Sequence, residues 1–590
     1  MPMPRPEHPR PQFQRQAWLN LNGPWRFAFD PGLSGEEQGW PQDPAGLQGN
    51  ITVPFCPESR LSGVGHTDFI PAVWYHRTFA VPDSWGACRV LLHFGGVDYD
   101  CQAWVNGQAV GRHYGGSASF AFDITAALRP GENQLVVRAQ DDVRSGVQPV
   151  GKQCSALRSR GCHYTRTTGI WQTVWLEGVP PSRIRRVRIV PDLDAGRFVV
   201  TPTLAGARRG QRFRVVLLDG QAEVASTSVP ASSGAAAVVE VPDPRPWSPA
   251  DPHLYDLRLE LVEGRETVDQ VTSYAGLRKF HLEGSRFYLN NEPVFLRFVL
   301  DQGFYPDGIW TAPSDRELRA DVERSQAVGF NGARLHQKVF EERFHYWADR
   351  LGYLTWGEFP DWGLDFGQPQ AVHNHQREWR EVVLRDLNHP SILAWTPFNE
   401  TAGPARVHPE VHRRALEEVY ELTRALDPAR PVHDASGYVH VRTDIFTVHN
   451  YEQDAERFAA TYAKVDPADP SQAHVCCPEL SVPYQGQPYV VDEYGGTWWQ
   501  EGAPPEGKDR SASWGYGNRP ASIEEVYRRI EELTRVLTNN PHISGFTYTQ
   551  LTDVEQEQNG IYTYDRRPKF DAARLRRAFG APAAAERGTP

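Results

Sequence analysis

Two glutamates, Glu400 and Glu493, have the setting in this chain that most suggests catalysis. Each lies at the end of a short apolar run, in residues 392–400 (ILAWTPFNE) and 489–495 (YVVDEYG). Hydrolysis of a glycosidic bond uses two carboxyl groups, and a retaining mechanism needs them about 5–5.5 Å apart, one as nucleophile and one as acid/base. Taken singly, either glutamate could equally form a salt bridge at the rim of a fold, so the hypothesis depends on the pair.

Apolar runs and amphipathic segments alternate after residue 279. The strands that we expect are 294–301, 331–336, 353–359, 392–400, 431–436, 445–451, 489–495 and 543–550. The helices that we expect are 314–329, 341–352, 376–387, 412–426 and 522–537, with Ser314 and Ser522 as N-caps. This alternation predicts a (β/α)8 TIM barrel.

The carboxyl ends of the strands form the catalytic face of such a barrel, so polar residues at these ends are expected to meet at one mouth. They are Asp301, Arg334, His336, Glu358, Asn399, Glu400, Asp434, His449, Tyr451, Glu493 and Gln550. A guanidinium beside one carboxylate favours its ionised form, and a second carboxyl facing that negative charge is driven to keep its proton. That division predicts one nucleophile and one acid at near-neutral pH.

The first half of the chain is rich in strand and turn signals. Residues 1–182 contain many short β-prone runs, and Asn106-Gly107 between two of them predicts a hairpin, so we expect a jelly-roll β-sandwich of the sugar-binding type. Residues 183–278 repeat this pattern in five or six short strands, which predicts an immunoglobulin-like β-sandwich. The expected protein therefore has three domains, with the catalytic barrel at residues 279–580.

The composition indicates which binding partners and which cellular compartment to expect. The net charge is −11 and no Lys/Arg-rich tract is present, which argues against nucleic acid and membrane surfaces as partners. No apolar leader or long apolar stretch is seen, so we expect a cytoplasmic protein. The seven scattered cysteines indicate reduced thiols, although Cys154 and Cys162 are close enough in sequence to pair. The expected partner is a carbohydrate substrate, and a homo-oligomer is left open.

These motifs give the chain a strong resemblance to glycoside hydrolase family 2, which holds β-galactosidases, β-glucuronidases and β-mannosidases. The resemblance rests on segments in the family's order, namely 21–32, 73–82, 164–179, 247–261, 274–297, 329–337 (GFNGARLHQ), 350–360 (RLGYLTWGEFP), 391–400 and 490–496. It implies a retaining exo-β-glycosidase in which Glu400 is the acid/base and Glu493 the nucleophile. It also implies that Asn399 holds the sugar 2-hydroxyl, that Arg334 and Tyr451 keep Glu493 ionised, and that His449 lines the pocket.

The sugar is harder to predict. Many members of the family end the eighth strand with a tryptophan, where this chain has Thr549 or Gln550, so Trp395, Trp498 or Trp499 would have to replace it. The further substrate-binding residues that we expect are His336, Glu358, Asp301, Trp498, Gln550 and Glu557, with a salt-bridge role as the alternative for Glu358 and Asp301.

The family's β-glucuronidases bind the substrate carboxylate with an Asn-x-Lys motif, but the matching residues here are Glu557-Gln558-Asn559. Glu555 and Glu557 would repel a uronate unless a cation such as Lys338 or Arg166 arrives from elsewhere. An acidic, amide-rich rim suits neutral sugars, so we favour a β-galactosidase-like enzyme. β-Glucuronidase or β-galacturonidase and β-mannosidase activities remain alternatives.

Three further hypotheses follow from the sequence. Residues 357–363 (GEFPDWG) lack the acidic-x-His metal pattern of the large β-galactosidases, and no zinc-like Cys/His spacing occurs, so we expect neither a metal nor a cofactor. The basic loop 150–169 is either a solvated loop or one that reaches a barrel mouth. A non-catalytic carbohydrate-binding protein would be expected to lack one carboxylate, and an endo-β-mannanase would not need the two β-domains.

Overall fold

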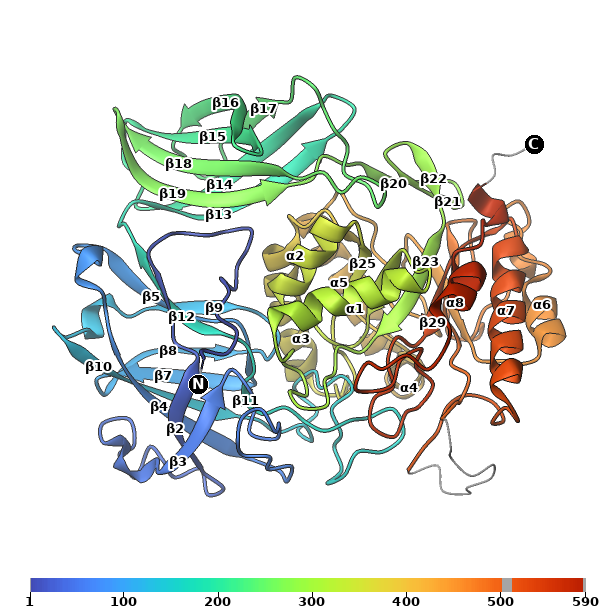
Figure 1. Ribbon diagram of the computed structural model, residues 1–590, viewed down its shortest axis with the longest axis horizontal. Helices are drawn as coiled ribbons and strands as arrows, with labels where there is room; N and C mark the ends of the chain where they lie inside the picture. The colour runs from blue at the N-terminus through green and yellow to red at the C-terminus, as the bar shows by residue number, and fades with distance from the viewer. Residues whose placement is uncertain (1, 501–511, 587–590) are drawn as a thin grey trace.

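The computed structural model describes residues 2–500 and 512–586. It has three parts in chain order (Figure 1): a jelly-roll sandwich at the left, an immunoglobulin-like sandwich above, and a barrel at the right. The multidomain fold expected from the sequence is confirmed. The boundaries at 182/183 and 278/279 remain our proposal.

The jelly roll packs two antiparallel sheets around one apolar core. One sheet has the order β1 (Trp18–Asn20), β12 (Val174–Val179), β5 (Arg89–Phe94), β9 (Phe120–Asp123). The other has the order β3 (Gly49–Val53), β2 (Gly23–Phe29), β4 (Ala72–Ala80), β10 (Glu132–Gln140), β7 (Asp100–Val105), β8 (Gln108–Tyr114), and β6 (Val97–Asp98) pairs with β11 (Gly169–Ile170). The predicted hairpin joins β7 to β8, because Asn106 and Gly107 both adopt the positive φ that its two-residue turn requires.

The second domain is a smaller sandwich. Its first sheet has the order β13 (Arg183–Asp192), β14 (Arg197–Ala205), β17 (Ala237–Glu240), and its second has the order β16 (Ala222–Pro230), β15 (Gln211–Asp219), β18 (Tyr255–Glu263), β19 (Glu266–Ala275). Alternate residues of these strands point inward and form a single core. A small sheet of β20 (Phe280–Glu283), β21 (Arg286–Leu289) and β22 (Glu292–Val294) leads from this domain into the barrel.

The barrel is a parallel sheet with the order β26 (Ile392–Thr396), β25 (Leu354–Glu358), β24 (Gly332–Leu335), β23 (Leu296–Asp301), β29 (Ile543–Thr549), β28 (Tyr489–Gly495), β27 (Phe446–Asn450). Its strands are almost wholly buried, as expected where helices cover the outside of a barrel and side chains fill its centre.

The predicted strand 431–436 is wrong as a regular strand. This segment closes the barrel beside β26 only through isolated bridges, Trp395 to Val432 and Asn399 to Ser436. On its other side, Val432 N–H donates to Asp444 Oδ2 (2.8 Å) and Gly437 N–H to Thr447 Oγ1 (2.9 Å). Side chains therefore replace the backbone ladder toward β27, and the segment keeps its place without regular pairing.

The helices lie outside the sheet (Figure 1). They are α1 (Asp315–Ala327), α2 (Glu342–Leu351), α3 (Pro369–Asp386), α4 (Ala402–Val407), α5 (Pro409–Leu426), α6 (Ala455–Tyr462), α7 (Ile523–Asn539) and α8 (Ala572–Phe579). Ser314 and Ser522 accept from the N–H groups of Glu317 and Glu525, which confirms both predicted N-caps. Helix α3 begins earlier than predicted, at Pro369, a residue suited to a first helical turn.

The loop 150–169 packs on the barrel of its own chain, and Figure 1 shows this teal segment leaving the jelly roll toward the barrel. Val150 N–H donates to the Trp362 carbonyl (2.8 Å), and nearby Asp365 N–H donates to the Gly146 carbonyl (2.8 Å). All seven cysteines are free, so Cys154 and Cys162 do not pair. Within the two described ranges, no helix combines the length and hydropathy needed to cross a bilayer.

Candidate active site

Glu400 and Glu493 face one another across the mouth of the barrel. A carboxylate oxygen of each and a ring nitrogen of His449 all lie within 4.8 Å of one another. The spacing agrees with the pair of carboxyl groups in retaining glycosidases and is shorter than the roughly 6.5–9.5 Å of inverting ones. Glu493 belongs to β28, whereas Glu400 follows the end of β26.

The backbone of Glu400 is unusual. Its φ of +53° is left-handed, which is rare for a residue with a side chain. Its N–H donates to the Ser436 carbonyl (2.9 Å), and the preceding Asn399 N–H donates to Asp361 Oδ1 (3.1 Å). These bonds hold a strained turn that sets the direction of the Glu400 side chain.

Arg334 connects the residues around Glu493. Its Nη1 donates to Glu493 Oε1 (2.9 Å), its Nη2 to Asn399 Oδ1 (2.6 Å) and its Nε to Glu358 Oε2 (2.5 Å). The guanidinium is fully buried, so these charge-assisted bonds act in a low-dielectric setting. Asn399 Nδ2 is buried and has no hydrogen-bond partner among the described residues.

A tyrosine binds the other oxygen of Glu493. The Tyr451 hydroxyl donates to Glu493 Oε2. The ring of Tyr451 stacks on Tyr516, with centroids 3.4 Å apart and planes 3° apart. The predicted partners Arg334 and Tyr451 thus contact both oxygens of Glu493, and Tyr516 is a supporting residue that carried no signal in the sequence.

His449 lies between the two glutamates. Its Nδ1 is 2.7 Å from Glu400 Oε1 and 3.5 Å from Glu493 Oε2, and its Nε2 is 3.3 Å from Asp492 Oδ1. Burial alone would lower the pKa of His449, but the charges of Glu493 and Asp492 and its hydrogen bonds outweigh burial and raise this pKa to about 10. His449 is therefore an imidazolium at neutral pH.

The protonation of Glu400 differs from our expectation. We expected its carboxyl to keep a proton opposite the charge of Glu493. Burial does raise the pKa of Glu400, but the hydrogen bond and charge of His449, followed by the charge of Lys152, lower it by more. Glu400 and His449 titrate as a pair, and in the free protein their shared proton lies on His449.

The same trio is, in the part of the chain that the structure describes, the one group of such side chains spaced closely enough to hold a metal ion. His449 and Glu400 are joined directly at 2.7 Å, so contacts within the protein already account for this close spacing.

Three other predicted residues have supporting positions. Glu358 accepts from Arg334 and from Gln337 N–H (3.0 Å), which is the salt-bridge alternative. His336 Nδ1 lies 3.0 Å from Glu358, and burial followed by the charge of Lys152 keeps the pKa of His336 well below its usual value. Asp301 accepts from Gly303 N–H (2.9 Å), and no described hydrogen bond joins it to either glutamate.

The predicted substrate-binding residues of the last barrel loop form a buried chain of hydrogen bonds. Gln550 donates to Asn559 (2.8 Å), Asn559 donates to Glu557 (3.1 Å), and Tyr164 of the jelly-roll loop donates to Glu557 (2.6 Å). Burial raises the pKa of Glu557. This chain ties the jelly roll to the barrel mouth.

Two of the tryptophans proposed as sugar platforms, Trp395 and Trp498, have different surroundings. Trp395 is fully buried and donates to Asp427 (2.9 Å), so it is structural. Trp498 is half-buried and donates to Ser513 (2.9 Å), which in turn donates to Gln558 (2.6 Å). Trp498, in the segment after β28, is thus linked through Ser513 to Gln558 of the last barrel loop.

Lys152 is the residue that sequence reasoning missed. It comes from the jelly-roll loop, is 6% exposed, and its ammonium lies 4.2 Å from the centre of the Trp362 ring. Trp362 donates to the carbonyl of Asn399 (3.2 Å), which places this cation beside the catalytic turn. Burial lowers the pKa of Lys152, but the negative charges around it, including those of Glu557, Glu493 and Glu400, raise it overall.

The two cations that the sequence suggested for a uronate are already engaged. Lys338 donates to the carbonyls of Gly303 (2.6 Å) and Trp310 (2.7 Å), and burial lowers its pKa to about 7. Arg166 donates to three backbone carbonyls. By contrast, no carboxylate of the described residues lies within 4.0 Å of the Lys152 ammonium.

The barrel, its polar mouth and the facing glutamates define a glycoside hydrolase. The chain belongs to glycosyl hydrolase family 2: residues 19–176 match the family's sugar binding domain, residues 182–278 match "Glycosyl hydrolases family 2", and residues 281–581 match its TIM barrel domain.

Proteins named β-glucuronidase and proteins named β-galactosidase are both among the relatives that this chain resembles. A β-glucuronidase of Paenibacillus borealis is 25% identical over 95% of this chain and 96% of its own length. A β-galactosidase of Thermoanaerobacter pseudethanolicus is 26% identical over 74% of this chain, which spans 57% of that relative. Among solved structures, a Lactobacillus rhamnosus β-glucuronidase matches 99% of this chain and all of its own with a TM-score of 0.80 at 21% identity, which supports the fold.

Proposed function

We propose that this protein is a retaining exo-β-glycosidase that releases terminal β-linked sugars by double displacement. The observation that carries the proposal is the placement of Glu400 and Glu493 with His449 inside 4.8 Å. A carboxylate pair this close leaves no room for the water that an inverting mechanism needs between the carboxyl groups.

In the first step, an oxygen of Glu493 bonds to the anomeric carbon as the glycosidic carbon–oxygen bond breaks. The leaving oxygen takes a proton from Glu400, which draws it from His449 2.7 Å away. In the second step, Glu400 removes a proton from water, the water oxygen bonds to the anomeric carbon, and Glu493 leaves as a carboxylate. Arg334 and Tyr451 hold Glu493 for both steps, and Asn399 Nδ2 is free to donate to the sugar 2-hydroxyl.

For the sugar, we propose a β-linked uronic acid, with glucuronate as the first candidate. Lys152 supplies a buried cation at the mouth, which the Glu557-Gln558-Asn559 segment itself lacks. The repulsion expected from Glu557 is reduced, because burial raises its pKa and Tyr164 and Asn559 bind its oxygens. The similarity to a β-glucuronidase along nearly the whole chain agrees with this choice.

A β-galactosidase-like activity, which we favoured from the sequence, is the second candidate. The observation in its favour is that the last barrel loop supplies Glu555 and Glu557 and has no Asn-x-Lys motif. Carboxylates there would accept hydrogen bonds from the hydroxyls of a neutral sugar.

One panel of nitrophenyl glycosides separates the candidates: β-glucuronide, β-galacturonide, β-galactoside, β-mannoside and α-arabinoside. We expect the highest kcat/KM on one of the two uronides. A highest value on the β-galactoside would select the second candidate, and a highest value on the β-mannoside or the α-arabinoside would contradict both. Release of single sugars from the end of an oligosaccharide tests exo-action, and shortened internal fragments would argue against it.

A further inference from the structure

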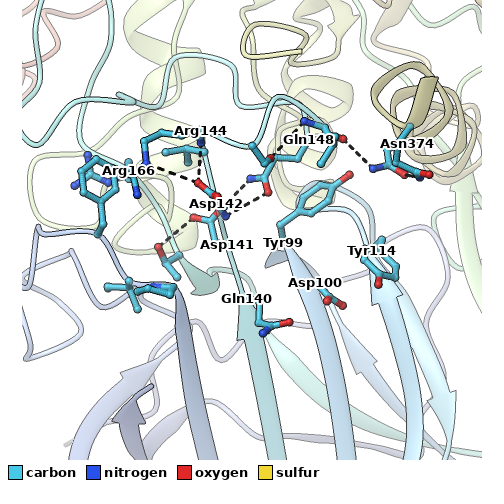
Figure 2. A pocket seen from close by; sticks show the side chains of 18 of the residues that line it. Tyr99, Asp100, Tyr114, Gln140, Asp141, Asp142, Arg144, Gln148, Arg166 and Asn374 are labelled. Carbon is cyan, nitrogen blue, oxygen red and sulfur yellow. Dashed lines mark hydrogen bonds and ion pairs between the residues drawn. The ribbon is translucent and has the colours of Figure 1, made fainter. Parts of the chain in front are cut away.

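The jelly roll and the barrel border a half-open cavity of about 690 Å³ at their interface. Figure 2 shows it above the strand ends of the jelly roll, with Asn374 of α3 on one side. None of the residues assigned to the active site lines it. Its volume is within the range of about 300–1,000 Å³ typical of sites for small molecules, and interfaces between domains are a preferred place for such sites.

The charges that line this cavity are already matched within the protein. Asp100 pairs with Arg112 (2.6 Å), Asp142 with Arg144 (3.8 Å) and Arg377 with Glu381 (3.8 Å). Arg166, which is also at the wall, donates to three backbone carbonyls. Each of these charges has an opposite charge or a hydrogen-bond partner nearby, so the wall presents no unmatched charge and favours an uncharged ligand.

The remaining charged group, Asp141, is also satisfied. Gln148 donates to Asp141 Oδ1 (2.7 Å) and Thr168 donates to its Oδ2 (3.2 Å), bonds that Figure 2 shows as dashed lines. Burial raises the pKa of Asp141 to about 6. This carboxyl therefore stabilises the wall of the cavity, and its oxygens are occupied by these hydrogen bonds and do not form a cation site.

Several uncharged polar groups at the wall have no partner. The Tyr99 hydroxyl, the Gln140 amide and the His373 ring make no side-chain hydrogen bond to any residue in 2–500 or 512–586. The ring of Tyr99 is 5% exposed, so its direction is set by packing, and its hydroxyl lies at the cavity with Gln148 and Asn374 (Figure 2). Sugar hydroxyls both donate and accept, as these three groups do.

We propose that this cavity is a second, non-catalytic saccharide site that binds uncharged sugar residues. Its walls combine apolar side chains such as Ile70 and Val143 with the unpartnered Tyr99, Gln140 and His373. One segment of the chain connects this cavity to Lys152. Gln148 of that segment lines the cavity, and Lys152, further along it, lies over the ring of Trp362. A neutral part of a larger glycoside would bind here without passing through the catalytic centre.

The test uses the full-length Glu493→Gln protein, which cannot turn over substrate under the proposed function, and measures binding of cellotriose, xylotriose and β-1,4-galactotriose by calorimetry. We expect at least one to bind, and the added changes Tyr99→Phe and Gln140→Ala to weaken that binding about tenfold or more, because each removes a hydrogen-bonding group without removing the wall. Gln376→Ala is the control. Gln376 is on α3, the helix that also carries His373, but it bonds to Glu418 and is outside the cavity.

Binding that is unchanged by Tyr99→Phe and Gln140→Ala, or no binding of any of the three probes, would overturn the proposal. Should the double variant fail to fold, His373→Ala at an exposed position of α3 tests the same wall. In the active protein, these changes are expected to leave nitrophenyl glycoside kinetics within about twofold of wild type. Binding is measured without turnover, so failure of this site and failure of the catalytic proposal give separate results.

Discussion

His449 Nδ1 lies 2.7 Å from Oε1 of Glu400. The same imidazole is 3.5 Å from Glu493 and 3.3 Å from Asp492, so three carboxylates surround one ring. The carboxyl of Glu400, the proposed acid/base, thereby shares its proton with a histidine that the sequence suggested only as a pocket residue. The pH behaviour of this enzyme is expected to follow the Glu400–His449 pair more than either residue alone.

This arrangement predicts a pH-dependent contribution of His449 to stability. Its folded-state pKa is raised from 6.5 to about 10, so its contribution is fully present below about pH 6.5 and is lost as the pH rises through about 10. We expect His449→Asn to be destabilised by about 3–5 kcal/mol at pH 6, because it leaves buried carboxylates without their cation. Urea unfolding of both proteins between pH 6 and 10.5 should show this difference shrinking, and a difference that grows with pH would contradict the assignment.

Replacing the proposed nucleophile should abolish turnover. Glu493→Ala removes the oxygens proposed to bond the anomeric carbon, so we expect kcat on aryl β-glycosides to fall by about 10⁴-fold or more with an intact circular dichroism spectrum. Glu479→Ala, at an exposed glutamate, is the control and should keep full activity. Full activity in a folded Glu493→Ala protein would remove Glu493 as the nucleophile.

The acid/base should respond differently. Glu400→Ala is expected to spare substrates with good leaving groups in the first step, because these need little help from an acid. Azide, which needs no general base, should then raise the rate by attacking the glycosyl-enzyme and give a β-glycosyl azide. Kinetics on nitrophenyl and alkyl glycosides, with and without azide, measure both effects, and a rate that azide leaves unchanged would count against the role of Glu400.

Lys152 should select acidic sugars. Lys152→Met removes the cation and keeps much of the apolar stem, so we expect kcat/KM on the preferred β-uronide to fall by about 10- to 100-fold, the worth of one hydrogen bond to a charged group. Activity on the β-galactoside should change by less than about threefold. The exposed Lys464 provides the control variant Lys464→Met. An equal loss on both substrates would instead indicate that Lys152 acts on the catalytic pair.

Much of the fold could be predicted because its signals are local. The alternation of apolar runs with amphipathic segments indicated the barrel, and Asn106-Gly107 indicated a hairpin whose turn needs positive φ at both residues. The irregular pairing of 431–436 was missed because the side chains of Asp444 and Thr447, which lie 12 and 10 residues further along the chain than their partners, replace its ladder. Such replacement leaves no periodic trace.

The candidate site shows the same difference between local sequence signals and contacts that form only in the folded chain. The sequence by itself determined which residues stand at the ends of the barrel strands, among them Glu400, Glu493 and Arg334, because strand periodicity and chain order are enough to place them on one face. Only the tertiary structure decided that His449 holds the proton of Glu400, that a lysine of the first domain lies over Trp362 and that a cavity opens between the domains. These relationships join residues far apart in the chain, and the electrostatic and packing forces that create them depend on distance in space.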